Sequence, residues 1–112
     1  MTFSIINKYT GEHCGICEYD KDKKLWSIDI DENSDSSTLA MLAKHHKTTR
    51  LSDWQVLPLL DEHLHEPNYT GIKNVLVQAG LSRWDRCGLL KYYKGDCCQD
   101  ELIFEVTDNV PD

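Results

Sequence analysis

The stretch between residues 67 and 104 constrains the fold most, because it contains two amphipathic segments too short to be stable as isolated helices. In the first segment, apolar residues recur at the i, i+3, i+4 and i+7 positions that line one face of a helix. These residues are Ile72, Val75, Leu76 and Ala79. Thr70 or Asn68 is expected to accept the first free backbone N–H, and Gly80 to end the helix in the left-handed conformation.

The second segment is expected to begin near Ser82 and to stop at Gly95. Its inward face is predicted to carry Trp84, Cys87, Leu90 and Tyr93. Two helices this short need a partner surface, and the segments before and after them are predicted to supply strands for it.

The N-terminal part of the chain predicts a three-stranded antiparallel meander, with short polar turns at residues 8–12 and 20–24. The expected strands are Phe3–Asn7, His13–Tyr19 and Leu25–Ile30. In the third strand Trp26, Ile28 and Ile30 alternate with other residues and therefore share one face. A short strand at Leu102–Val106 is expected to pair with this meander.

Two further helical regions lie between the meander and residue 67. The first is Thr38–His46, capped by Ser36 or Ser37, and its inward face is expected to hold Leu39, Leu42, Ala43 and His46. The second is Leu51–His65, with Ser52 as cap and an inward face of Trp54, Leu57, Leu60 and Leu64. Pro58 lacks the N–H that a helix interior needs, at a cost of about 3 kcal/mol. We therefore expect this helix to start late, with residues 51–55 as a separate turn and residues 47–50 as a break.

Together these segments predict an α+β fold in which a small antiparallel sheet packs against three to four short helices. The sheet consists of the N-terminal three-stranded meander plus a C-terminal strand. A chain of 112 residues suits one domain, expected over residues 1–106, followed by a polar tail at residues 107–112 that is expected to fray.

The net charge of -7 argues against nucleic acid or an acidic membrane surface as partner, because phosphate binding needs clustered lysine and arginine. No apolar run approaches the roughly 20 residues of a spanning helix, and the first residues do not have the pattern of a signal peptide. We therefore expect a cytoplasmic protein without a membrane partner. In that compartment the five cysteines are expected to be free thiols or metal ligands rather than disulfides.

The cysteines offer one pattern that is typical of metal sites. Cys14 and Cys17 have the spacing of half a zinc site, but Cys97 and Cys98, the nearest thing to a second pair, are adjacent in sequence. Packing of Cys14 and Cys17 as small half-buried hydrophobes in a strand is the preferred interpretation. No metal and no cofactor are therefore expected, with zinc bound by these four cysteines as the alternative and His13 and Cys87 as further candidate ligands.

The histidines and acidic residues do not form a pattern typical of an active site. His45 and His46 are interpreted as the cationic end of a helix, with a pH-sensitive or metal-binding patch as the alternative. His63 and His65, beside Asp61 and Glu62, diverge on a helix, so a solvated surface is preferred. Nucleotide-binding loops, a glycine-flanked serine and an acid–base pair are all missing from the sequence, so no catalytic residue and no enzymatic activity are expected.

Aromatic residues are more numerous than a small core demands, and some could be anchors of a protein–protein contact. Trp54, Tyr92 and Tyr93 are the candidates for such anchors. For Trp26, Trp54 and Trp84, burial in the core is an equally good interpretation.

Short motifs across most of the chain resemble the N-terminal subdomain of HipA-like serine/threonine kinases, the toxin kinases of bacterial toxin–antitoxin systems. The motifs are Pro67, Gly71-Ile72, Gly80-Leu81, Trp84-Asp85, Leu89-Leu90-Lys91, Gly95, Asp100 and Phe104, preceded by the N-terminal FSIINK and a strand pair that ends in EYD. The chain differs from the family at Thr70, where an arginine is usual, and at Leu102-Ile103-Phe104, where the family has an aromatic residue, Trp and Ile.

The resemblance implies a stand-alone version of that subdomain, as in HipS-like proteins, where a separate small protein binds a shortened kinase and restrains it. The family's catalytic and phosphate-binding segments have no counterpart in these residues, so no catalytic residue is carried over. The function implied is that of an antitoxin-like protein whose partner is a HipA-like kinase. Two alternatives are an inhibitor from a phage or mobile element that binds another host protein, and a zinc-stabilised interaction module.

Overall fold

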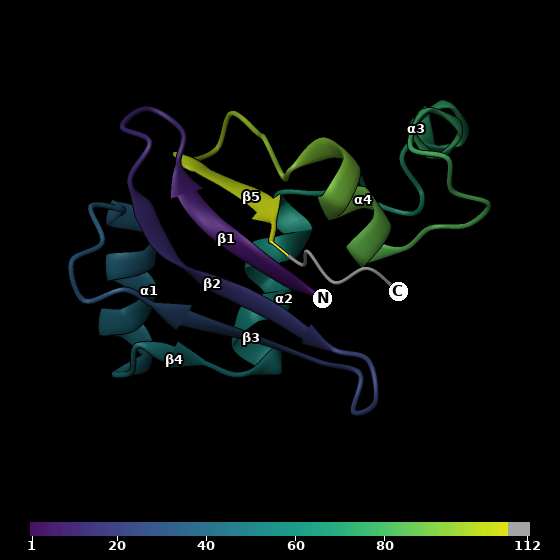
Figure 1. The fold of residues 1–112 in the computed structure, drawn as a ribbon. Coiled ribbons are helices and arrows are strands. Elements are labelled where there is room, and N and C mark those ends of the chain that lie inside the picture. The colour runs from purple at the N-terminus through teal and green to yellow at the C-terminus, as the bar shows by residue number, and fades with distance from the viewer. Residues whose placement is uncertain (108–112) are drawn as a thin grey trace.

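The computed structural model describes residues 1–107, which form a five-stranded sheet and four helices (Figure 1). The strands are β1 (Thr2–Asn7), β2 (His13–Asp20), β3 (Leu25–Ile30), β4 (Arg50–Leu51) and β5 (Leu102–Val106). The helices are α1 (Ser37–His46), α2 (Asp53–Glu62), α3 (Ile72–Gln78) and α4 (Arg86–Tyr93). Most of the predicted polar tail, residues 108–112, lies outside the described residues.

The strands lie in the order β4-β3-β2-β1-β5, and every neighbouring pair is antiparallel. The predicted meander is confirmed, and so is its pairing with the final strand: β5 lies beside β1, with Ile5 opposite Phe104. The α+β fold class predicted from the sequence is therefore correct.

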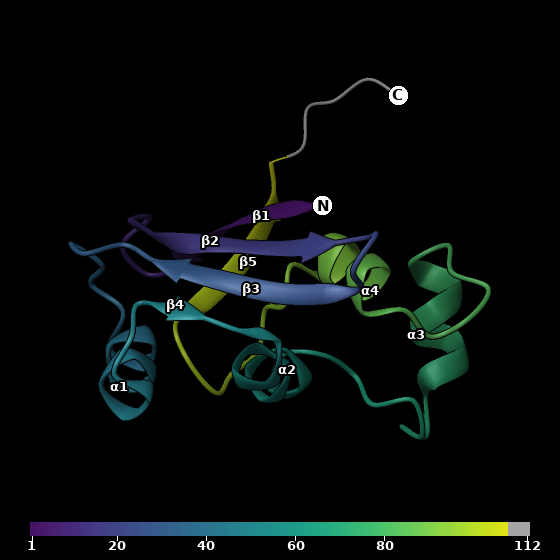
Figure 2. The same cartoon turned by 90° about the horizontal axis from the view of Figure 1, so that it is seen from below.

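One face of the sheet is covered by helices and the other is not (Figure 2). Alternation directs Phe3 and Ile5 of β1 to the covered face, and Trp26, Ile28 and Ile30 of β3 are buried as predicted. The core lies between this face and the buried positions of the helices. Its largest fully buried side chains include Phe3, Phe104, Ile5, Ile28, Leu39, Leu51, Leu60 and Leu90.

Both edges of the sheet have backbone N–H groups that are already occupied. At the β3 edge, Trp26 N donates to Asp53 Oδ1 at the start of α2, over 2.8 Å. At the β5 edge, Phe104 N donates to the carbonyl of Lys94 over 2.7 Å. Because free edge groups are what a foreign strand pairs with, these bonds make edge pairing with a partner chain less favourable.

The α2 helix differs from the prediction in its start. It runs without interruption from Asp53, with Ser52 as N-cap and Pro58 inside it, so the expected late start is wrong. The Gln55 side chain accepts a hydrogen bond from Ser52 N over 2.9 Å, which is one bond of a capping box. This cap, together with the burial of Val56, Leu59 and Leu60, compensates for the hydrogen bond lost at Pro58.

Of the helix pair predicted to organise the fold, α3 is peripheral, whereas α4 joins the core through Leu89 and Leu90. α3 buries none of its residues and lies at the far end of the molecule in both views (Figures 1 and 2). Its N-cap is Gly71, not Thr70 or Asn68, although Gly80 has the expected left-handed conformation with φ of 72°. α4 begins at Arg86 rather than near Ser82, because Asp85 caps it by accepting from Gly88 N.

The α1 helix matches its prediction closely. Ser36 caps it by accepting from Leu39 N over 3.1 Å, and Leu39 is fully buried. The segment that follows is not only a break, since Arg50 and Leu51 form β4 at the edge of the sheet. Among the described residues, no helix has both the length and the apolar character needed to cross a bilayer.

Candidate functional site

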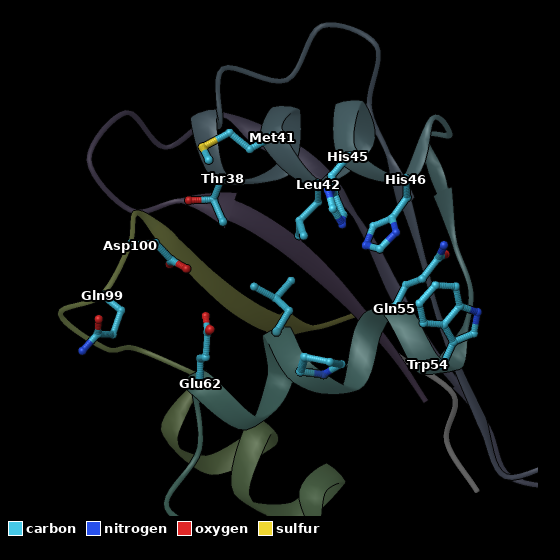
Figure 3. Close-up of a pocket in the computed structure, with 12 residues that line it drawn as sticks. Thr38, Met41, Leu42, His45, His46, Trp54, Gln55, Glu62, Gln99 and Asp100 are labelled. Atoms are coloured by element: carbon cyan, nitrogen blue, oxygen red, sulfur yellow. The ribbon is translucent and has the colours of Figure 1, made fainter.

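An open groove of about 700 Å³ lies between α1 and α2 (Figure 3). Residues of α1 form one wall, residues of α2 form the other, and the loop before β5 closes one end. The lining residues are Thr38, Met41, Leu42, His45, His46, Trp54, Gln55, Pro58, Leu59, Glu62, Gln99 and Asp100. Its volume falls in the range of roughly 300–1,000 Å³ that is usual for binding sites.

The groove exists because each helix buries a narrow stripe and leaves an apolar flank uncovered. α1 buries only Leu39, and α2 buries Val56, Leu59 and Leu60. Met41 and Trp54 are left 72% and 69% exposed, so the prediction that Trp54 faces inward is wrong. Large apolar side chains exposed on the walls of a groove are typical of a site that another molecule covers.

Histidines of α1 hold the indole of Trp54 in place at one end of the groove. The ring of His46 meets that of Trp54 edge to face, with centroids 5.5 Å apart, and His45 packs on His46 at 4.8 Å. An aromatic side chain held by a neighbouring ring loses less conformational entropy when it binds a partner. His45 and His46, predicted to be the end of a helix, therefore also line the groove.

The opposite end of the groove is polar and carries Glu62, Gln99 and Asp100. Behind it, Glu101 joins the start of β5 to the start of α1. Its carboxylate accepts from Ser36 Oγ over 2.6 Å, and from Thr38 N and Oγ1 over 3.1 and 3.0 Å. Burial on its own would raise the pKa of Glu101, but these hydrogen bonds outweigh it and lower the pKa to about 2.

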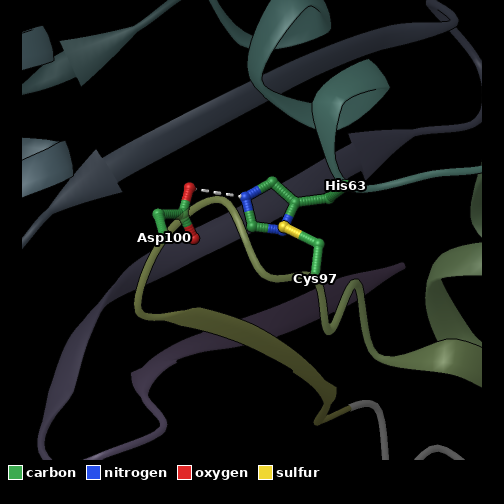
Figure 4. A group of neighbouring side chains, drawn as sticks. All are labelled: His63, Cys97 and Asp100. Carbon is green, nitrogen blue, oxygen red and sulfur yellow. Dashed lines mark hydrogen bonds and ion pairs between the residues drawn. The ribbon is translucent and has the colours of Figure 1, made fainter.

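Asp100 also belongs to a second group of side chains, which joins the end of α2 to the loop before β5 (Figure 4). His63, the C-cap residue of α2, has Nε2 at 2.9 Å from Asp100 Oδ2 and Nδ1 at 2.5 Å from the Gly95 carbonyl. The sulfur of Cys97 lies 3.4 Å from Nδ1. His63 is only 6% exposed, so the predicted solvated surface at this residue is wrong.

A metal ion could be held by this group. A ring nitrogen of His63, the Cys97 sulfur and a carboxylate oxygen of Asp100 all lie within 4.8 Å of one another. Across residues 1–107, no other three His, Cys, Asp or Glu side chains meet this distance limit. The four cysteines considered from the sequence therefore do not gather: Cys14 and Cys17 lie buried in β2, and Cys98 is exposed.

The buried thiols are poor nucleophiles. Burial raises the pKa of both Cys14 and Cys17, and burial together with the Asp85 charge raises the pKa of Cys87 to about 11. Because the thiolate is the reactive form, these three residues are protonated near neutral pH and act as packing groups. This agrees with the preferred interpretation of Cys14 and Cys17, although both are fully rather than half buried.

The three aromatic residues proposed as anchors lie in different settings. Trp54 lines the groove, whereas Tyr92, 52% exposed, lines a separate depression beside α4. Tyr93 is half-buried and donates its hydroxyl to the Val75 carbonyl over 2.9 Å, so it ties α4 to α3. The His65 ring packs against the Tyr93 ring at a tilt of 59°, with centroids 5.5 Å apart.

Comparison with known proteins gives no relative on which to base an assignment. No protein family, curated protein or solved structure matches this chain. Any function must therefore be argued from the groove and from the group around His63.

Sequence reasoning missed the groove and the group around His63 for two different reasons. The groove depends on which flank of α2 is buried, and Pro58 obscured where that helix begins. The partners of His63 lie 32 to 37 residues further along the chain, so no local spacing brings them together. The one available signal was the position of His63 at the end of a helix, because such an end folds back onto other elements.

Proposed function

We propose that this chain is a non-catalytic protein-binding module, and that an apolar segment of a partner protein occupies the groove between α1 and α2. The observation that carries the proposal is the pair of exposed apolar side chains, Met41 and Trp54, on the walls of that groove. Anchors of protein interfaces are commonly large residues that fill or frame such a depression.

The lining of the groove favours an amphipathic helix as occupant. Its walls are two helix faces, with Leu42, Pro58 and Leu59 among the lining residues, and an apolar helical ridge packs well into a channel of this kind. The exposed Glu62 at one end favours a lysine or arginine on the partner. The net charge of -7 would speed the approach of a basic surface.

The partner we propose is a HipA-like kinase, which the chain would bind and restrain as an antitoxin does. This identification rests on the sequence motifs that resemble the N-terminal subdomain of such kinases. The physical basis is domain reassembly: a subdomain separated from a larger fold keeps an apolar face that docks again on the remainder. The uncovered flanks of α1 and α2 are a surface suited to this docking.

The test is co-elution of the purified protein with a HipA-like kinase from the same genome. We expect a stable complex on size-exclusion chromatography and slower autophosphorylation of the kinase. Trp54→Ala should weaken binding by at least tenfold, the scale of a hot-spot residue. Tyr9→Ala is the matched control, because Tyr9 is 78% exposed in a turn and does not line the groove.

Two results would contradict the proposal. If the protein binds no HipA-like kinase of its genome, such a kinase is not its partner. Equal binding by wild type and Trp54→Ala would remove the groove as the docking surface. If the chain instead inhibits another host protein, it should fail to bind a HipA-like kinase. Trp54→Ala should then weaken its binding to that other protein.

A further inference from the structure

The group formed by His63, Cys97 and Asp100 combines three kinds of metal ligand from two distant segments. His63 ends α2, while Cys97 and Asp100 lie on the loop between α4 and β5. An imidazole nitrogen, a thiol sulfur and a carboxylate oxygen are the three ligand types that zinc accepts in proteins. All three ligand atoms lie within 4.8 Å of one another.

The hydrogen bond from His63 to Gly95 orients the imidazole for metal binding. The Gly95 carbonyl can only accept, so Nδ1, 2.5 Å away, must carry a proton. A ligating histidine usually donates its second ring N–H in this way, often to a backbone carbonyl, which fixes the tautomer and directs the other nitrogen to the metal. In His63 that other nitrogen is Nε2.

Nε2 and Asp100 Oδ2 then face each other at 2.9 Å. In the neutral ring with its proton on Nδ1, both atoms present lone pairs and repel. A cation held by both atoms would remove this repulsion. The side chain of His63 is fully buried and that of Asp100 is 9% exposed, so little water is present to separate the two groups.

The Cys97 sulfur is the observation that favours a metal ion over a proton. A second proton on Nε2 pairs His63 with Asp100 and leaves the sulfur in contact with Nδ1 alone, whereas a metal ion uses all three side chains. We propose that His63, Cys97 and Asp100 bind one divalent transition metal ion, zinc by ligand preference, through Nε2, the thiolate and a carboxylate oxygen.

The three ligand atoms, within 4.8 Å of one another, must rearrange to the spacing of a coordination sphere. Bonds of about 2.0–2.3 Å to zinc place tetrahedral ligand atoms roughly 3.3–3.6 Å apart. Nε2 and Oδ2 must separate slightly from 2.9 Å, and the sulfur must move from its place near Nδ1 toward Nε2. Cys97 is on a loop and half-buried, which allows that movement. Three protein ligands leave the fourth position for water.

A bound ion would fasten the loop before β5 to the end of α2. Because Asp100 and Glu62 line the groove, the metal would also stiffen the polar end of that groove. This inference does not depend on the identity of the partner, since the ion would bind the isolated chain.

The experiment titrates chelator-treated full-length protein with Zn²⁺ and, separately, with Co²⁺. We expect one equivalent of zinc to bind and the melting temperature to rise, because a ligand that binds only the folded state stabilises it. Cobalt should give a thiolate-to-metal charge-transfer band in the near ultraviolet. Cys97→Ser should abolish that band and lower zinc affinity at least tenfold, a loss typical of a removed ligand.

Cys98→Ser is the matched control, because Cys98 is the exposed neighbour of Cys97 and should leave the band and the affinity unchanged. Asp100→Asn should weaken zinc binding while the protein remains folded by circular dichroism. A native chain that shows neither zinc binding nor a cobalt–thiolate band overturns the proposal in favour of a His63–Asp100 ion pair. Loss of the band in Cys98→Ser rather than in Cys97→Ser overturns the assignment of ligands.

Discussion

At the scale of single residues, the five cysteines have separate roles that their local environments decide. Cys14 and Cys17 are core residues of β2, and Cys87, in the first turn of α4, is partly buried against the core. Cys98 is exposed, and Cys97 lies beside His63. The CxxC motif of Cys14 and Cys17 therefore serves packing. Cys97, the cysteine whose sulfur contacts the His63 ring, belongs to no recognisable metal-binding motif.

The thiol environments lead to a testable order of reactivity. At pH 8 a thiol with a pKa of 8.5 is about a quarter ionised, but one with a pKa near 11 is only about 0.1% ionised. In the folded protein at pH 8 we expect iodoacetamide to modify Cys98 first and Cys14, Cys17 and Cys87 only after unfolding. Peptide mass spectrometry measures this order, and labelling of Cys17 as fast as Cys98 would contradict it.

Glu101 is the residue whose charge we expect to matter most for stability. Its carboxylate accepts from Ser36 and Thr38 and so joins β5 to the capped end of α1. Glu101→Gln replaces one acceptor oxygen with a donor and removes the charge, so we expect a loss of about 1–3 kcal/mol in the free energy of unfolding. Urea denaturation measures this loss. Glu18→Gln, exposed on β2, should change it by less than about 0.5 kcal/mol.

At the scale of elements, helix ends show where local sequence is informative and where it is not. α1 was predicted well because a serine cap and an apolar face lie within a few residues of each other. α2 was not, because Pro58 argues against a helix locally while Gln55 and the buried Val56 favour one. The pairing of β5 with the meander was predicted, though not that its neighbour is β1, and the two-residue strand β4 is too short to leave a pattern.

The group around His63 shows the same limit for the candidate site. Its local context, a histidine beside two acids at a helix end, predicts a solvated surface. Burial comes instead from Gly95 and Asp100, which only the closure of β5 onto β1 brings to the end of α2. Contacts that depend on the whole chain cannot be read from spacing within one element.

The C-terminus of α1 gives a prediction for a single helix end. Lys47 has φ of 56°, a left-handed conformation that is unfavourable for residues with a Cβ. Lys47→Gly should therefore raise the free energy of unfolding by about 0.5–1 kcal/mol. Lys44→Gly, inside the same helix and equally exposed, should lower it by about 1 kcal/mol. Thermal denaturation compares the two, and a loss of stability in both variants would contradict the role assigned to Lys47.

At the scale of the whole molecule, the sheet separates two different surfaces. The face without helices (Figure 2) is mixed: Ser4 and Asp29 lie opposite Ile16, which is 40% exposed, and Leu25 of β3 is 48% exposed. The edges are occupied by Asp53 and by the turn after α4. Met41 and Trp54 are more exposed than Ile16 and Leu25 and both line the groove between α1 and α2, where we expect a partner to dock.

The same architecture predicts an uneven distribution of local stability. α3 buries no residue and is held through a few contacts, such as the bond from Tyr93 to the Val75 carbonyl. α2, by contrast, buries Val56, Leu59 and Leu60 against the sheet. Segments with few buried apolar contacts open locally without unfolding of the whole domain. We therefore expect α3 to be the least stable helix of the part of the chain that the structure describes.

Hydrogen exchange measures this difference directly. Amides of α3 should exchange at least a hundredfold faster than those of α2, which corresponds to about 2.7 kcal/mol of local opening free energy. Tyr93→Phe, which removes the bond to Val75, should speed exchange in α3 and leave α2 unchanged. If the amides of α3 were as protected as those of α2, the helix would have to be part of the cooperative core. The sheet with α1 and α2 would then not be the only part of the described residues that unfolds with the global free energy of unfolding.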